Sequence, residues 1–129
     1  MPAAGDALHG PGLTLLIDRL EPDVLEMEVW YDGSGRMPPE HLHPAQAERF
    51  RVLEGRMNTV IGGSEAVYAE GETFDVPAAT RHQMAADGRT RVRWEVRPAL
   101  RTAEFFERLY SGRVDENFLS EFAAEIRFT

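Results

Sequence analysis

Short runs of alternating apolar and polar residues, separated by turn residues, extend over residues 13–101 of this 129-residue chain. In the cleanest run, RVRWEVR at 91–97, Val92, Trp94 and Val96 share one face, while arginines and a glutamate share the other. Successive side chains of a strand point to opposite faces, so each run predicts a strand with one face toward a core. Many short strands of this kind are typical of an all-β sandwich or barrel.

Two further stretches support the same interpretation. The run VLEMEVWYD places four side chains on one face: Leu25, Met27, Val29 and Tyr31. Gly62 and Gly63 interrupt another apolar stretch, and glycine takes the positive φ values that a tight hairpin turn requires. The sequence therefore predicts a hairpin at this pair.

After Pro98 the apolar period changes from two to nearly four. Thr102 is a possible N-cap and Gly112 a possible end of a first helix. Phe118, Phe122 and Ile126 form an i, i+4, i+8 stripe that predicts a second helix. We expect one domain over 1–129, with a barrel core at about 12–100 and two C-terminal helices at about 102–127.

Charge and composition exclude several classes of function. The net charge of −8 and the pI near 5.0 disfavour nucleic acid and anionic membrane surfaces as partners. No apolar stretch has the length of a membrane span, so we expect a cytoplasmic protein. The chain has no cysteine, and all 14 of its basic residues are arginine. Thiolate ligands, cysteine nucleophiles and lysine chemistry are therefore excluded.

Four ionisable residues stand where strand interiors are expected. His41 and His43 are two apart, so in a strand both imidazoles project to one face. Glu48 shares parity with the apolar residues of the run AERFRVLEG, which places its carboxylate on the inner face. His82 follows VPA, at the start of another expected strand. This pattern predicts that three imidazoles and one carboxylate face the interior.

Three histidines and a glutamate suit one divalent transition metal: Fe, Mn, Ni, Co, Cu or Zn. In an octahedron they would leave two positions open, as a catalytic metal requires. The alternative is that the histidines are ordinary surface or core residues, because an H-x-H pair alone is a weak signal. That simpler interpretation suits His9, which has no partner nearby in the sequence.

The spacing of these residues resembles two motifs of the cupins. Residues 35–55 fit the first motif, GxxxxxHxHxxxxExxxxxxG, through five positions: Gly35, His41, His43, Glu48 and Gly55. The second motif, GxxxxxPxGxxHxxxN, is matched by Gly71, Pro77 and His82. The chain thus resembles a small single-domain cupin of the RmlC-like superfamily.

Two positions depart from the second motif. Ala79 replaces its glycine and Ala86 its asparagine. Alanine tolerates positive φ poorly, so we expect the turn before His82 to avoid that conformation. The asparagine position is not a metal ligand, so Ala86 does not affect the predicted site.

The resemblance implies a double-stranded β-helix, or jelly-roll, barrel that is usually homodimeric. It also implies a metal in the barrel mouth, held by His41, His43, Glu48 and His82. Four residues are candidates for the pocket wall, although plain core packing is as good an interpretation for each: Phe50, Val52, Met84 and Trp94. The arginine-rich strand at 89–97 and the C-terminal helices are candidate surfaces for a homodimer.

Cupins perform unrelated reactions, so the fold alone does not choose one. We expect a metal-dependent enzyme acting on a small organic molecule, with dioxygenase-type oxidation as the first hypothesis and Glu48 as a possible general base. A non-redox isomerase, polyketide-cyclase-like enzyme or lyase is the first alternative, and a non-catalytic small-ligand-binding protein is the second. A sugar-phosphate enzyme ranks lower, because the arginines of the predicted strands point outward.

Overall fold

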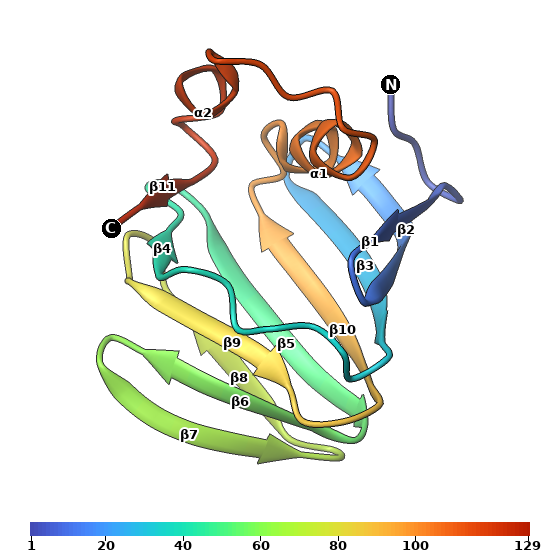
Figure 1. Ribbon diagram of the computed structural model, residues 1–129, viewed down its shortest axis with the longest axis vertical. Coiled ribbons are helices and arrows are strands. Elements are labelled where there is room, and N and C mark those ends of the chain that lie inside the picture. Colours follow the sequence, from blue (N-terminus) through green and yellow to red (C-terminus); the bar gives the residue numbers. More distant parts are fainter.

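A computed structural model describes residues 1–129, and nearly half of the chain forms strands in two antiparallel sheets (Figure 1). The six-stranded sheet has the order β1-β2-β3-β10-β5-β8, and the five-stranded sheet has the order β11-β4-β9-β6-β7. The first sheet contains β1 (Ala7–Gly10), β2 (Leu13–Glu21), β3 (Val24–Tyr31), β10 (Thr90–Arg97), β5 (Ala47–Glu54) and β8 (Thr73–Val76). The second contains β11 (Arg127–Phe128), β4 (His41–Leu42), β9 (His82–Ala86), β6 (Arg56–Ile61) and β7 (Ser64–Ala69).

This arrangement confirms the predicted all-β fold of jelly-roll type. Consecutive strands such as β5 and β6 belong to different sheets, so the chain repeatedly crosses from one layer to the other. The strands begin earlier than expected, because β1 pairs with β2 through Ala7↔Leu16 to Gly10↔Leu13. No helix of the structure has the length and apolar character needed to cross a membrane.

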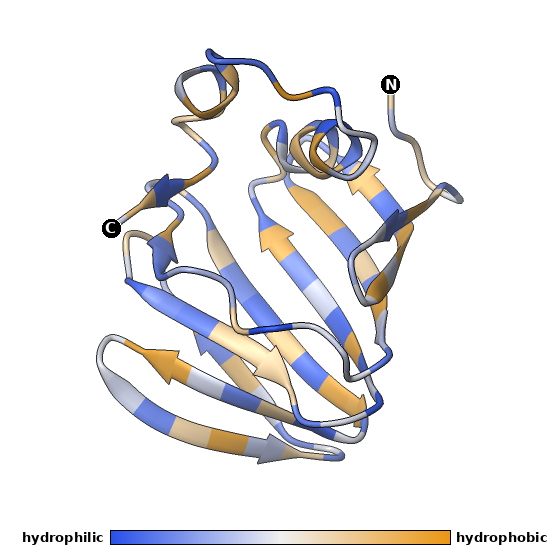
Figure 2. Ribbon diagram, in the orientation of Figure 1, coloured by the Kyte–Doolittle hydropathy of each residue, from blue (hydrophilic) through white to orange (hydrophobic).

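The core lies between the two sheets and follows the alternation in the sequence. Val92 and Val96 of β10 are buried, and Arg93 and Glu95 between them lie on the outer face of the sheet. Bands of hydrophobic and hydrophilic residues alternate along the strands in Figure 2. The predicted hairpin is also confirmed, because Gly62 and Gly63 both have positive φ and connect β6 to β7.

The C-terminal region differs from the prediction in its second helix. Helix α1 (Thr102–Tyr110) ends before Gly112, which has a φ of 76°. Helix α2 (Phe118–Glu121) has only four residues, and the stripe expected to reach Ile126 is not helical. The backbone turns after Phe122, and the chain then pairs as β11 with β4 (Figure 1).

A small second core fastens α2 to α1. Phe105, Phe118 and Phe122 are buried together, with the rings of Phe105 and Phe118 stacked at 5.1 Å. Arg101 and Arg108 of the α1 region both pair with Glu121 of α2. The C-terminal segment is therefore attached to the barrel through α1 as well as through β11.

The turn before His82 contradicts the expectation about Ala79. Its φ is 60°, in the left-handed region that glycine occupies at the corresponding position of the cupin motif. The conformation directs the Ala79 amide to the His43 carbonyl, at 2.8 Å. This hydrogen bond joins the 77–82 turn to the segment that carries two of the predicted ligands, which explains why the turn keeps a conformation unfavourable to alanine.

We predict that Ala79→Gly raises the free energy of unfolding by about 0.5–1 kcal/mol, because glycine removes the cost of left-handed φ. Urea denaturation of the metal-free protein measures the change. Ala78→Gly is the matched control: Ala78 has no positive φ, so its replacement should lower stability slightly. An equal loss of stability in both variants would contradict this explanation of the turn.

Candidate metal centre

The two sheets bring the predicted ligands together at one end of the barrel. His41 of β4 and His82 of β9 are directly paired Cα partners in the five-stranded sheet. Glu48 extends from β5 in the opposite sheet, and His43 lies just after the end of β4. His82 therefore meets three residues from a segment more than thirty positions earlier, between the two sheets.

The three imidazoles are close enough to share one ion, and the Glu48 carboxylate lies beside two of them. The ring nitrogens of His41, His43 and His82 lie within 4.8 Å of one another. The Glu48 Oε1 atom lies 3.1 Å from His43 Nε2 and 3.0 Å from His82 Nε2. Glu48 and His82 are almost completely buried, whereas His41 is partly exposed toward the cavity.

Each imidazole is oriented by a backbone carbonyl. The Nδ1 atoms of His41, His43 and His82 lie 3.0, 2.7 and 2.9 Å from carbonyl oxygens. A carbonyl only accepts hydrogen bonds, so each Nδ1 carries the proton and donates it. In the neutral ring, Nε2 then keeps its lone pair, and this is the usual arrangement behind a metal-binding histidine.

The donor set fits a cation at this place. Glu48 Oε1 is buried without a hydrogen-bond donor other than a protonated imidazole. Two Nε2 lone pairs and a carboxylate oxygen repel one another unless a positive charge lies between them. Adjacent ligands about 2.1 Å from one metal would be about 3.0 Å apart at right angles, which is the separation found here between Oε1 and each Nε2.

Glu48 and His41 have the protonation states that suit a metal at neutral pH. In the metal-free site, burial opposes ionisation of Glu48, but hydrogen bonds and positive charge from protonated His43 and His82 prevail and lower its pKa to about 2, so a bound cation would take the place of those protons. Burial lowers the pKa of His41 to about 4, although the hydrogen bond to Pro39 opposes the shift. Glu48 is therefore ionised and His41 neutral, the forms in which these side chains bind metals.

Trp94 supports the carboxylate from behind. Its Nε1 donates a hydrogen bond of 2.8 Å to Glu48 Oε2, so Oε1 is the oxygen left to face the imidazoles. The sequence identified Trp94 only as a candidate wall residue. Its inward parity was visible in the sequence, but its position opposite Phe50 on the paired strand and its contact with Glu48 come only from the fold.

A cavity of about 370 Å³ opens in front of the site. Of the predicted wall residues, Phe50, Met84 and Trp94 line it. Val52 does not: it is fully buried in the main core, because it lies two residues farther along β5 and away from the barrel mouth.

Several lining residues were not identified from the sequence. Tyr31 and Tyr110 both reach the cavity, and burial raises the pKa of both phenols, that of Tyr110 to about 12. Tyr31 had a usable signal in its inward parity on β3. Arg36 also lines the cavity from the loop between β3 and β4, so not all arginines face away from the site. Ile126 and Phe128 come from the C-terminal segment that was expected to be helical.

Gln46 lies near the site but has a structural role. It is buried, and its Nε2 lies within hydrogen-bonding distance of the Pro98 and Ala99 carbonyls and of the Thr102 hydroxyl, at 2.8–3.1 Å. These contacts join β5 to the connection between β10 and α1. They also explain why Thr102 is the first residue of α1 and not its N-cap.

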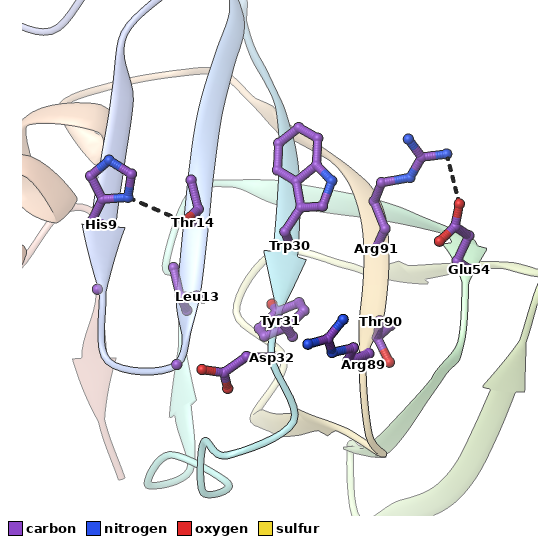
Figure 3. Close-up of a pocket in the computed structure, with 12 residues that line it drawn as sticks. His9, Leu13, Thr14, Trp30, Tyr31, Asp32, Glu54, Arg89, Thr90 and Arg91 are labelled. Carbon is purple, nitrogen blue, oxygen red and sulfur yellow. Dashed lines mark hydrogen bonds and ion pairs between the residues drawn. The ribbon is translucent and has the colours of Figure 1, made fainter.

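A separate hollow of about 540 Å³ lies on the outer face of the six-stranded sheet (Figure 3). Trp30, Arg91 and His9 are among its lining residues. His9 bonds to Thr14 and takes no part in the histidine cluster, as the sequence indicated. At one edge of the hollow, Arg91 pairs with Glu54 of the neighbouring strand β5, at 3.4 Å.

Comparison with known proteins identifies one family and many similar structures. Residues 27–96 match the cupin domain family, and no curated protein sequence matches the chain. The structure of KdgF from Halomonas sp. is 23% identical with a TM-score of 0.66, covering 72% of this chain and 87% of that chain. An RmlC-like cupin from Shewanella frigidimarina is 21% identical with a TM-score of 0.67, covering 74% and 86%.

A third similar structure covers almost the whole chain. A variant of Streptomyces Pac13 with uridine is 13% identical with a TM-score of 0.66, covering 98% of this chain and 85% of that chain. Pac13 is described as a nucleoside dehydratase. At these identities the structures establish a common fold, in which three clustered histidines could hold a metal.

Proposed function

This chain belongs to the cupin domain family, and from that premise we propose that it is a metal-dependent enzyme acting on a small organic molecule. The observation that carries the proposal is Glu48 Oε1, which lies 3.0–3.1 Å from two Nε2 atoms whose rings are turned by backbone carbonyls. We propose His41, His43, Glu48 and His82 as the ligands of one divalent transition metal, Fe, Mn, Ni, Cu or Zn.

A bound metal of this kind would supply Lewis acidity toward a substrate oxygen. The residues of the chain provide the rest of the chemistry. Glu48 is an ionised carboxylate, and when its Oε1 is released from the metal this oxygen can accept a proton from the substrate as a general base. Trp94 keeps Glu48 Oε2 in place. Phe50 and Met84 provide apolar walls that exclude water from a substrate of small size.

Dioxygenase-type oxidation is the first hypothesis from the sequence, and it remains a prediction for a protein that contains Fe, Mn, Ni or Cu. A non-redox lyase reaction is the second candidate. Two observations favour it: the fold shared with a nucleoside dehydratase over 98% of this chain, and the two phenols in the cavity. Tyr31 and Tyr110 stay protonated at neutral pH, so either can donate a hydrogen bond to a departing hydroxyl.

We also propose that the chain forms a homodimer through the outer face of its six-stranded sheet. The binding partner at this face is a second copy of the chain, because basic and acidic residues alternate across the face. Arg91 lies 3.7 Å from Glu28, and Arg93 lies 3.7 Å from Asp18. Two such faces related by a two-fold axis can place unlike charges opposite each other. Trp30 stands exposed beside Arg91 (Figure 3), and a tryptophan is a frequent anchor of interfaces.

The metal proposal predicts close to one transition metal per chain in untagged protein purified without chelator. The double variant His41→Ala/His43→Ala should lose this metal, because half of the proposed ligands are gone. His9→Ala is the matched control and should retain it. Elemental analysis measures all three proteins. Absence of metal from the wild type even after reconstitution would contradict the proposal and favour a non-catalytic binding protein.

The metal that elemental analysis finds decides which activity assay follows. With Fe, Mn, Ni or Cu, we expect oxygen consumption with a flavonol such as quercetin as the probe. With Zn, we expect a non-redox reaction, for which uridine is the first probe and loss of 18 Da in mass spectrometry is the signal of dehydration.

The dimer is tested by sedimentation at micromolar concentration. We predict a dimer for the wild type and a shift to monomer for Trp30→Glu, because the new carboxylate would be buried in the interface. Val67→Glu is the control, since Val67 is an exposed apolar residue on β7 of the other sheet. A wild type that sediments only as a monomer would remove the proposal.

A further inference from the structure

We infer that the C-terminal segment, residues 122–129, is a functional part of the metal centre. The Glu125 carbonyl positions the ring of His43, and Phe128 limits the size of the substrate that can enter the cavity. This inference rests on the metal-dependent function proposed above. It makes Glu125 a positioning residue and Phe128 a specificity-determining residue for that site.

His43 differs from the other two histidines in the origin of its hydrogen-bond acceptor. His41 and His82 donate to Pro39 and Thr80, each two residues earlier in the chain. His43 donates to the Glu125 carbonyl, 82 residues away, at 2.7 Å. Local backbone geometry therefore fixes two rings, whereas the third ring depends on where the C-terminal segment is placed.

The segment is held on both sides of Glu125. Before it, Phe122 is completely buried in the second core against α1. At Glu125 itself, the buried carboxylate accepts a hydrogen bond of 3.3 Å from the Arg101 amide. After it, β11 pairs with β4 through Arg127↔Leu42 and Phe128↔His41. These contacts place the carbonyl against His43 Nδ1, so that His43 Nε2 faces Glu48.

The same segment closes the cavity. Ile126 and Phe128 both line it, and the Phe128 ring lies 6.0 Å from the His41 ring. Phe128 is 45% exposed, so it stands at the mouth, where a substrate would pass. The match to the cupin family ends at residue 96. This wall is therefore supplied by a part of the chain outside the matched domain.

The positioning role is tested with Ile126→Pro and its matched control Ile126→Ala. Proline at 126 removes the Ile126 amide, which donates to the Phe122 carbonyl, and forces a new backbone conformation on Glu125. Alanine at position 126 keeps the amide donor and puts no new restriction on the backbone of Glu125. Nitrogen-15 NMR of the metal-free proteins reports the tautomer of each imidazole.

In Ile126→Pro we expect His43 to lose its single Nδ1–H tautomer while His41 and His82 keep theirs. Isothermal titration with Zn²⁺ should show affinity weaker by about 10–100-fold, the usual effect of losing such a contact behind a ligand. In Ile126→Ala the His43 tautomer should be unchanged. An unchanged His43 tautomer in Ile126→Pro would overturn the positioning role. If that variant does not fold, a chain ending at Ala123 takes its place.

The size limit is tested with Phe128→Ala and the control Leu119→Ala, which alters an exposed residue of α2. The probes are acetohydroxamate and the bulkier benzohydroxamate, bound to the Zn²⁺-loaded protein and measured by isothermal titration. Phe128→Ala should raise the affinity for benzohydroxamate relative to acetohydroxamate by about tenfold, whereas Leu119→Ala should leave the ratio unchanged. An unchanged ratio in Phe128→Ala would overturn the role of Phe128.

These experiments separate the inference from the proposed function. A wild type that binds no Zn²⁺ would contradict the metal-dependent function. The tautomer comparison uses metal-free protein, so it would still decide whether Glu125 orients His43.

Discussion

The arrangement of the barrel mouth depends on one carboxylate oxygen, Glu48 Oε1, which lies between the Nε2 atoms of His43 and His82 in a buried place. Burial of an ionised carboxylate is expensive unless positive charge compensates it. Both sheets contribute to the compensation, because Glu48 comes from β5 and His82 from β9. Trp94 and three backbone carbonyls then restrict how each group can turn. A cation at this point reconciles the burial with the charge.

The sequence predicted the parts of this site that follow from strand parity and motif spacing. Alternation placed Glu48 on the inner face of β5, and the H-x-H spacing placed His41 and His43 beside each other. Contacts that depend on long-range folding could not be predicted in this way. The bond from His43 to Glu125 joins residues 82 apart, and it requires α2 to stop at Glu121 where the apolar stripe predicted a longer helix. Ala79 was misjudged because a hydrogen bond to His43 outweighs its intrinsic preference.

The residues matched by the family and the rest of the chain contribute different parts of the site. The two sheets provide the charged groups, and these lie within or close to the motifs of the family. Helix α1 and the C-terminal segment, which follow the matched residues 27–96, provide part of the cavity wall. Proteins with the same fold can therefore keep similar ligands and still accept different substrates, which agrees with the observation that function resides in sites and not in folds.

The most direct test of the account is a crystal structure of the protein grown with Zn²⁺, with anomalous diffraction measured at the zinc absorption edge. We expect one strong anomalous peak about 2.0–2.2 Å from the Nε2 atoms of His41, His43 and His82 and from Glu48 Oε1. A cluster that stays without a peak, or a peak only at His9 on the outer face, would contradict it.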